Sequence, residues 1–199
     1  HPERARKFEC AGRTWSIETS GGTHEVDFLI GADGAASRVR ATVTRPFVSS
    51  DLILALGYHL PGLYDPGVMR VAYQEVGFQG YIWSFPCVDR TLTGIGRHLP
   101  GIRAADLKKR LDGFLASEYS SAGGDRTFYA AIIPCLSRSS LIHQRVCGRA
   151  WALVGDAAGF TDGITAEGIY YAFRSAELLA DSIRRGDPVT YEAAWREEF

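Results

Sequence analysis

The sequence has few cysteines, a single methionine and almost no net charge, and it lacks any long apolar run. Its four cysteines are widely spaced and form no CxxC pair, so we expect free thiols in a reducing cytoplasm rather than a disulfide framework. Its five histidines show neither i,i+4 pairing nor a nearby cysteine, which argues against a metal site. No stretch approaches the roughly 18–20 apolar residues that a membrane helix needs.

Charge and length narrow the class of protein further. A net charge of -1 and a pI near 6.6 give no concentrated basic surface, which argues against nucleic acid as a partner. The 199 residues, 46% of them hydrophobic, are enough for one large or two small globular domains. The start has neither an initiator methionine nor the apolar core of a secretion signal, so we expect the chain to begin within a longer protein.

Hydrophobic periodicity predicts a chain with both strands and helices. Residues 13–19 alternate and, after a Ser-Gly-Gly turn, residues 23–30 are expected to complete a β-hairpin. Closely spaced strands with short connections then predict an antiparallel sheet. The further elements expected are a short helix from Ala36 to Thr42, strands at 52–60, 68–74, 80–86 and 91–98, a helix at 103–119, and strands at 127–134 and 150–154.

The last long element is the clearest helix. It carries one apolar stripe over about four turns, as in a helix that packs one face against a core. The stripe consists of Ile169, Ala172, Phe173, Ala176, Leu179, Ala180 and Ile183. Arg184 and Arg185 complement the helix dipole, Gly186 suits the cap and Pro188 prevents continuation, so the helix is expected to end there.

The first candidate site is the turn Gly31-Ala32-Asp33-Gly34, which follows the buried run Phe28-Leu29-Ile30 and leads into a helix. Backbone donors and the helix dipole at such a turn favour phosphate or ribose groups. The alternative interpretation is structural: Asp33 and Ser37 would only cap the helix. Residue pattern alone leaves both interpretations open.

The second candidate is the segment Val154-Gly155-Asp156-Ala157-Ala158-Gly159, with Gly163 and Gly168 ahead of the long helix. Small residues let the backbone approach a bulky ligand, and Asp156 can accept hydrogen bonds from sugar-type hydroxyls. The positive end of the helix would stabilise negative charge, such as develops on a reduced flavin. A glycine-rich loop that only packs closely is the alternative.

The third candidate is Gly80-Tyr81-Ile82-Trp83-Ser84-Phe85-Pro86. On a strand, Tyr81, Trp83 and Phe85 share one face, where they could wall a pocket for an apolar substrate. Such a row of aromatic residues is more often part of a hydrophobic core, and that alternative stays open at this point.

These three segments, in this order, resemble the FAD-dependent geranylgeranyl reductase family, within the wider class of flavin aromatic hydroxylases and halogenases. The segments GADGAASRVR and WALVGDAAG look like the second and third flavin motifs of that class, and GYIWSFP is similar to the narrower Tyr-x-Trp-x-Phe-Pro element of the reductases. The resemblance covers residues 13–199. It implies an α+β fold, with the C-terminal part of a Rossmann-type FAD-binding domain and an antiparallel-sheet substrate domain.

The resemblance also implies roles for individual residues. Asp156 would bind ribityl or ribose hydroxyls, the backbone at Gly168 and Ile169 would face the flavin ring, and Asp33 would serve the phosphate-ribose side. The implied cofactor-binding residues are Asp33, Gly34, Gly155, Asp156, Ala157, Gly163, Gly168 and Ile169, and the implied substrate-binding residues are Tyr81, Trp83 and Phe85. No catalytic proton donor is identified.

Two residues depart from the family pattern, and one motif is missing. The family usually has Pro at the position of Gly163 and Gly at the position of Ala166, so flavin contact could shift and the loop could be less pre-organised. The GxGxxG fingerprint does not occur: Gly94-Ile95-Gly96 begins it, but Leu99 stands where the third glycine belongs. We therefore expect a missing N-terminal Rossmann segment and weak or absent FAD binding by this chain.

The resemblance places residues 1–45 and 141–199 in the FAD-binding domain and residues 46–140 in the substrate domain. The expected activity of the whole protein is reduction of C=C bonds in an isoprenoid-like, apolar small-molecule lipid, with possible peripheral membrane contact. Two alternatives are a flavin-dependent monooxygenase or halogenase, and a non-catalytic domain with an empty half-site. The expected location is cytoplasmic.

Overall fold

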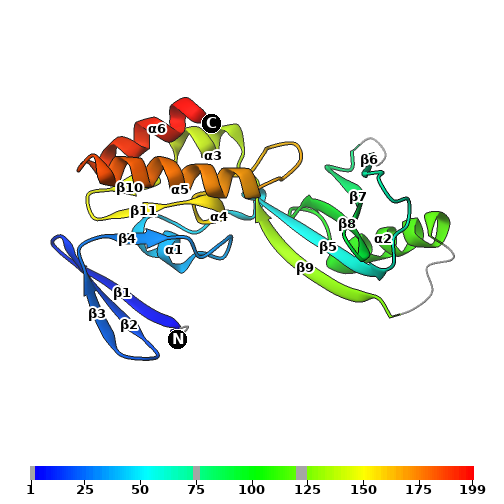
Figure 1. The fold of residues 1–199 in the computed structure, drawn as a ribbon, viewed down its shortest axis with the longest axis horizontal. Coiled ribbons are helices and arrows are strands. Elements are labelled where there is room, and N and C mark those ends of the chain that lie inside the picture. The colour runs from blue at the N-terminus through cyan, green and yellow to red at the C-terminus, as the bar shows by residue number, and fades with distance from the viewer. Residues whose placement is uncertain (1–2, 74–76, 120–124) are drawn as a thin grey trace. The chain divides into compact units, whose positions relative to one another are not determined.

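A computed structural model describes residues 3–73, 77–119 and 125–199 and divides the chain into two compact units. Unit 1 consists of His1–Phe47 and Pro134–Phe199, and unit 2 of Val48–Ile133. Helices and antiparallel sheets occur together, so the expected α+β class is confirmed (Figure 1). Each unit has its own hydrophobic core. The functional role given to each part of the chain stays a prediction.

Unit 1 opens with a three-stranded antiparallel sheet whose strands are β1 (Ala5–Ala11), β2 (Thr14–Thr19) and β3 (Thr23–Val26). Pattern reasoning did not find β1, and its single strand over residues 23–30 was wrong. That segment contains two strands, because β4 (Leu29–Gly31) leaves the hairpin and pairs in parallel with a strand far along the chain. The apolar run after the hairpin strand therefore belongs to a different sheet. Its predicted burial is confirmed for Leu29 but not for Ile30, which is 45% exposed.

The second sheet of unit 1 has the order β10-β11-β4 and lies at the centre of the unit's core. Its strands β10 (Cys147–Gly148) and β11 (Trp151–Leu153) are antiparallel to each other. Figure 1 shows α5 and α6 running alongside each other near β10 and β11. The helices of the unit are α1 (Arg38–Val43), α3 (Arg138–His143), α4 (Gly155–Ala158), α5 (Ile169–Arg184) and α6 (Tyr191–Glu198), with a 3-10 turn at Pro188–Thr190.

Helix α5 forms where the sequence predicts it, but of its predicted apolar stripe only Leu179 is buried. Ile169 and Phe173 are 73% and 72% exposed, whereas the buried residues are Ser175, Leu179 and Ser182. Burial of the two serines is inexpensive, because each hydroxyl donates to a carbonyl one turn earlier in the same helix. The small side chains let the helix pack closely, so polarity alone did not indicate its inner face.

Unit 2 is a five-stranded sheet in the order β6-β7-β8-β5-β9, with helix α2 (Ala104–Glu118) packed into its core. The strands are β5 (Leu52–Pro61), β6 (Arg70–Tyr73), β7 (Gly80–Pro86), β8 (Arg90–His98) and β9 (Thr127–Pro134), and a 3-10 turn at Ser49–Asp51 precedes them. The predicted antiparallel pairing is confirmed for β5–β8, β6–β7 and β7–β8. Gln74, at the end of the strand predicted at 68–74, lies outside the described residues.

Helix α2 directs Leu107, Leu111 and Leu115 into the core, as their spacing predicts. Against them pack side chains from one face of the sheet, including Ile82 and Ile95. Because successive strand residues point to opposite faces, the neighbours of Ile82 and Ile95 belong to the other face. That other face carries the predicted aromatic row.

Candidate functional site

The carboxyl of Asp33 is held by its own helix. It accepts hydrogen bonds from the amides of Arg38 (2.7 Å) and Val39 (3.2 Å) and from the hydroxyl of Ser37, which itself caps α1. Gly34 follows in a left-handed conformation, with φ of 78°. These contacts correspond to the capping interpretation. A cofactor-binding role of Asp33 and Gly34 stays a prediction. It would require the Asp33 carboxylate to accept a further hydrogen bond beside the three that it receives from Ser37, Arg38 and Val39.

The turn that contains Gly155 and Ala157 is packed tightly into unit 1. Gly155 adopts a φ of 54° and donates its amide to the hydroxyl of Ser175 at 2.9 Å. Ala157 is fully buried, and its carbonyl accepts a hydrogen bond at 3.3 Å from the guanidinium of Arg40. Arg40 thereby links α1 to α4. Both small residues are required by packing, and their contact with a cofactor stays a prediction.

Asp156, between them, is arranged differently. Its carboxyl accepts no hydrogen bond from any residue that the structure describes, although the residue is half-buried. Burial raises the pKa of Asp156, because removal from water disfavours its charged form. A methyl group at Gly168 would lie 3.0 Å from Oδ1 of Asp156, so the glycine backbone passes directly beside this carboxyl. The Asp156 carboxyl is therefore an acceptor without a donor in the described part of the protein.

The start of α5 supplies donors at the same place. Within the described part of the chain, the amides of Gly168 and Ile169 donate to no protein group, whereas the Tyr170 amide donates to the carboxylate of Glu167 at 2.8 Å. The first amides of a helix carry its partial positive charge. An acceptor and two free donors thus lie side by side. These residues fit a ligand that offers hydroxyl groups to Asp156 and a negative edge to the helix.

The loop that connects α4 to α5 is ordered by Asp162 rather than by a proline. The carboxylate of Asp162 accepts hydrogen bonds from the amides of Ile164 (2.9 Å) and Thr165 (2.6 Å) and from the Thr165 hydroxyl (2.9 Å). These bonds lower the pKa of Asp162, with the two amides as the main cause. Gly163 lies exposed at the tip of this turn. The loop therefore has a local source of order despite the missing proline.

Ala166 is strained by its backbone conformation, with φ of 56°, a region in which a Cβ is unfavourable. Glycine adopts this left-handed conformation without strain. We expect Ala166→Gly to stabilise the protein by about 0.5–1 kcal/mol, because relief of strain exceeds the added entropy of the unfolded chain.

Urea unfolding of the two proteins measures this difference. Gly113→Ala makes the reverse substitution at an exposed position within α2. It should also stabilise the protein, because alanine has a higher helix propensity than glycine. Equal or lower stability of Ala166→Gly would contradict the strain at this loop.

The aromatic row of β7 lies on the face of the unit 2 sheet opposite the α2 core. Tyr81, Trp83 and Phe85 are half-buried and alternate with the buried Ile82 and Ser84. Tyr81 and Trp83 are ring neighbours, with centroids 5.7 Å apart. None of the three belongs to the hydrophobic core cluster of unit 2. The row therefore lies outside the core cluster of unit 2, and its role as a substrate wall stays a prediction.

Two glycines of the neighbouring strand β8 leave space for the side chains of this row. Gly94 and Gly96 oppose Trp83 and Tyr81, and methyl groups there would lie 2.3 and 3.3 Å from the indole of Trp83. The incomplete fingerprint at residues 94–96 is thus a packing feature of a strand. Sequence reasoning missed Tyr129, whose ring covers Gly57. The only signal available was a glycine interrupting the apolar strand at residues 52–60.

Within residues 3–73, 77–119 and 125–199, no group of three or more His, Cys, Asp or Glu side chains is arranged to hold a metal ion. In the same ranges, none of the helices combines the length and apolar character required to cross a bilayer.

The known proteins similar to this chain include reductases of geranylgeranyl compounds and a menaquinone reductase. No family model matches the chain. Geranylgeranyl diphosphate reductase of Oryza sativa is 32% identical over 174 residues, which cover 82% of this chain and 35% of the relative. Digeranylgeranylglycerophospholipid reductase of Methanosphaerula palustris is 29% identical over 136 residues, covering 61% of this chain and 32% of that protein. The chain thus spans about a third of the length of these relatives.

Solved structures share the fold. A geranylgeranyl bacteriochlorophyll reductase-like protein of Thermoplasma acidophilum superposes with a TM-score of 0.81 at 23% identity, covering 99% of this chain and 54% of that one. A tryptophan 6-halogenase of Streptomyces toxytricini gives a TM-score of 0.72 at 18% identity, covering 96% and 39%. The resemblance that the motifs indicate is confirmed: this chain is a homologue of the geranylgeranyl reductases, with flavin-dependent halogenases among its structural neighbours.

Proposed function

We propose that the whole protein is an FAD-dependent oxidoreductase that reduces C=C bonds of an isoprenoid-like lipid. The observation that carries the proposal is the half-buried carboxyl of Asp156 beside the amides of Gly168 and Ile169, none of which has a hydrogen-bond partner among the described residues. The names of the relatives, which are reductases of geranylgeranyl compounds, support the reaction class. The isolated chain would form half of the cofactor site.

In this proposal each residue at the start of α5 has a defined task. Asp156 accepts hydrogen bonds from ribityl or ribose hydroxyls, which supply the donors that its carboxyl lacks. The amides of Gly168 and Ile169 stabilise negative charge on the edge of the flavin ring. FAD, when bound, supplies the hydride chemistry. The protein's own contribution is orientation and electrostatic stabilisation.

The substrate would pack against the aromatic face of unit 2. Tyr81, Trp83 and Phe85 offer flat apolar surface without charge, which suits the isoprene units of a polyprenyl chain. Exposed apolar residues continue this face on the edge strand β6, where Val71 opposes Trp83 and Tyr73 opposes Tyr81. A lipid could therefore reach the row from the edge of the sheet.

We expect Trp83→Ala to raise KM for a polyprenyl substrate several-fold, because the largest apolar surface of the row is lost. The measurement uses the whole protein, reduced with dithionite under nitrogen and supplied with geranylgeranyl diphosphate, with the reduced product followed by mass spectrometry. Phe128→Ala is the matched control: this exposed aromatic ring lies against Tyr58, which belongs to the α2 core. Equal KM for Trp83→Ala and the parent protein would contradict the proposed substrate wall.

A flavin-dependent monooxygenase or halogenase is the second candidate, favoured by the halogenases among the structural neighbours. The two activities differ in their use of oxygen. Rapid oxygen consumption by the reduced protein, coupled to hydroxylation or halogenation of an aromatic compound, would support this candidate over the reductase. A third possibility concerns the chain by itself, as a non-catalytic domain. Flavin absorbance in the purified 199-residue chain would contradict it.

A further inference from the structure

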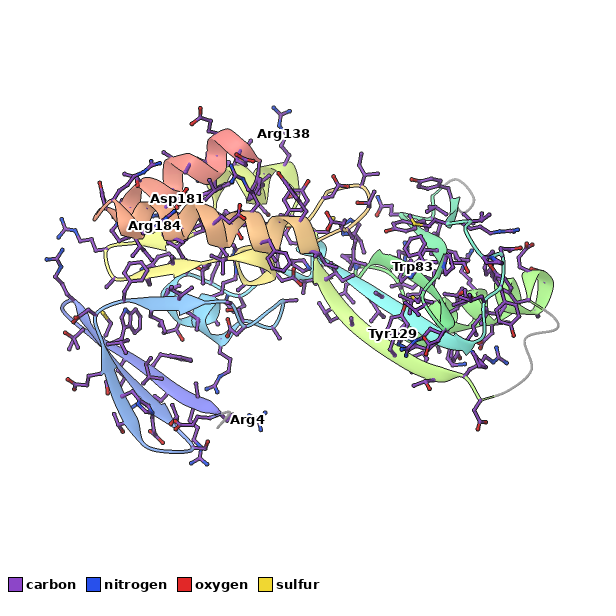
Figure 2. All side chains as sticks on the ribbon, in the orientation of Figure 1. Arg4, Trp83, Tyr129, Arg138, Asp181 and Arg184 are labelled. Atoms are coloured by element: carbon purple, nitrogen blue, oxygen red, sulfur yellow. The ribbon has the colours of Figure 1, made fainter. Side chains whose placement is uncertain are left out.

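A pair of opposed glycines brings the polar tips of two aromatic rings together. Gly57 of β5 and Gly94 of β8 are direct partners in the antiparallel register. A methyl at Gly57 would lie 2.2 Å from the hydroxyl oxygen of Tyr129, and one at Gly94 would lie 2.6 Å from Cε2 of Trp83, the carbon bonded to Nε1. Paired Cα atoms in such a sheet are roughly 4.5–5.5 Å apart. The hydroxyl and the indole N–H therefore meet above one glycine pair, and Figure 2 labels both residues.

The Tyr129 hydroxyl lowers the stability of the folded protein, because it is removed from water without a replacement hydrogen bond among the described residues. It is fully buried and has no hydrogen-bond partner among the residues that the structure describes. Burial raises the pKa of Tyr129, and the nearby indole of Trp83 acts in the opposite direction. The ring centroids of His59 and Tyr129 lie 5.2 Å apart. The Nδ1 atom of His59 is likewise buried without a described hydrogen-bond partner. A phenylalanine would fill the same volume without a desolvated hydroxyl, so packing by itself does not account for tyrosine.

We propose that Tyr129 is a positioning residue whose hydroxyl accepts a hydrogen bond from the Trp83 indole N–H when a substrate packs against the outer side of Trp83. The bond would hold the indole flat over Gly94 and Gly96 and give the substrate a firm wall. In the structure the two groups are adjacent but short of hydrogen-bonding geometry, so a small tilt of the indole completes the contact. The inference rests on the proposed function, because it assigns Trp83 to the substrate.

The test is Tyr129→Phe in the whole protein, which keeps the ring and removes only the hydroxyl. We expect KM for geranylgeranyl diphosphate to rise about 2- to 10-fold, the range that loss of one hydrogen bond produces, with a smaller change in kcat. The thermal midpoint of unfolding should stay equal or rise, since a buried unpaired hydroxyl is removed. In the presence of substrate, the Trp83 contribution to fluorescence, obtained by subtracting the Trp83→Phe spectrum, should shift to longer wavelength as the indole loses its fixed position.

Tyr119→Phe is the matched control on the other face of the same sheet. The Tyr119 hydroxyl donates to Ser84 at 2.8 Å, so its removal should lower the thermal midpoint and leave KM unchanged. Unchanged KM and unchanged Trp83 emission in Tyr129→Phe would overturn the inference, as would a lowered midpoint with unchanged KM. Failure of the proposed function is detected by a different result: the Trp83→Ala protein would then have the same KM as the parent protein. The emission measurement then still decides whether Tyr129 and Trp83 interact.

Discussion

Replacement of Asp156 by alanine is expected to weaken FAD binding by the whole protein about 10- to 100-fold. Hydrogen bonds to a charged acceptor contribute roughly 1.5–3 kcal/mol, and each 1.4 kcal/mol corresponds to a factor of ten in Kd. The Asp156 carboxyl is the strongest acceptor in the candidate site because no described protein group competes for it. Fluorescence titration of the apoprotein with FAD gives Kd directly.

Asp181→Ala is the control for this measurement. Asp181 lies in α5 near its C-terminal end and pairs with Arg184, so its removal changes charge on the same helix without reaching the site. We expect its Kd for FAD to match that of the parent protein. A Kd for Asp156→Ala within twofold of the parent value would reject Asp156 as a cofactor ligand.

The raised pKa of Asp156 also gives its contribution to stability a definite sign. The folded pKa exceeds its ordinary value of 3.8, so the folded state binds the proton more tightly than the unfolded state does. Stability from this group is therefore fully present below that ordinary value and is lost as the pH rises through the folded pKa. In urea unfolding of the apoprotein, Asp156→Asn should gain stability relative to the parent between pH 4 and pH 7. Saturating FAD should remove this gain.

Gly94→Ala is expected to destabilise the protein by about 1–3 kcal/mol, the usual cost of overpacking a well-packed site. A methyl at Gly94 would lie 2.3 Å from Trp83 and 2.8 Å from the carbonyl oxygen of Leu56. The indole can rotate away, but the backbone of β5 is fixed by its pairing with β8. The substitution should therefore displace Trp83 and raise KM for a polyprenyl substrate as well.

Gly113→Ala shows what the same chemical change does where space is free. Among the described residues, no atom lies within 4 Å of the added methyl, apart from the two chain neighbours and the helix's own nearby backbone. Helix propensity favours alanine by about 1 kcal/mol. Opposite signs for Gly94→Ala and Gly113→Ala in urea unfolding are the expected result. Stabilisation by both substitutions would mean that Trp83 does not occupy the space above Gly94.

Local pattern was sufficient for the antiparallel sheet of unit 2 and for helices α1, α2 and α5, but it did not predict α3, α4 or α6. Strand β7 spans Gly80–Pro86 as its alternation predicts, and α2 buries Leu107, Leu111 and Leu115 at helical spacing. Period and turn residues act between near neighbours in the chain, so they can be read without the rest of the fold. The motifs likewise carried enough information to indicate the reductase homology.

Contacts between distant residues could not be read in this way. The pairing of Leu29 with Trp151 divides the second predicted strand between two sheets, and the choice of Ser175 rather than Phe173 as an inward residue depends on what α5 packs against. The approach of Tyr129 to Gly57 depends on the order of strands in the sheet. Such choices follow from packing and hydrogen-bond satisfaction across the whole unit.

The sequence by itself therefore indicated most strands of unit 2 and the two longest helices, which family the chain resembles and which residues are candidates for the site. Only the tertiary structure showed which polar groups among the candidates already have partners, because those partners come from distant parts of the chain or from the local fold. The carboxyl of Asp33 is used by α1, whereas that of Asp156 lacks a described donor. A residue's type gives its capacity to bind, but the neighbours that folding brings to it decide whether that capacity remains for a ligand.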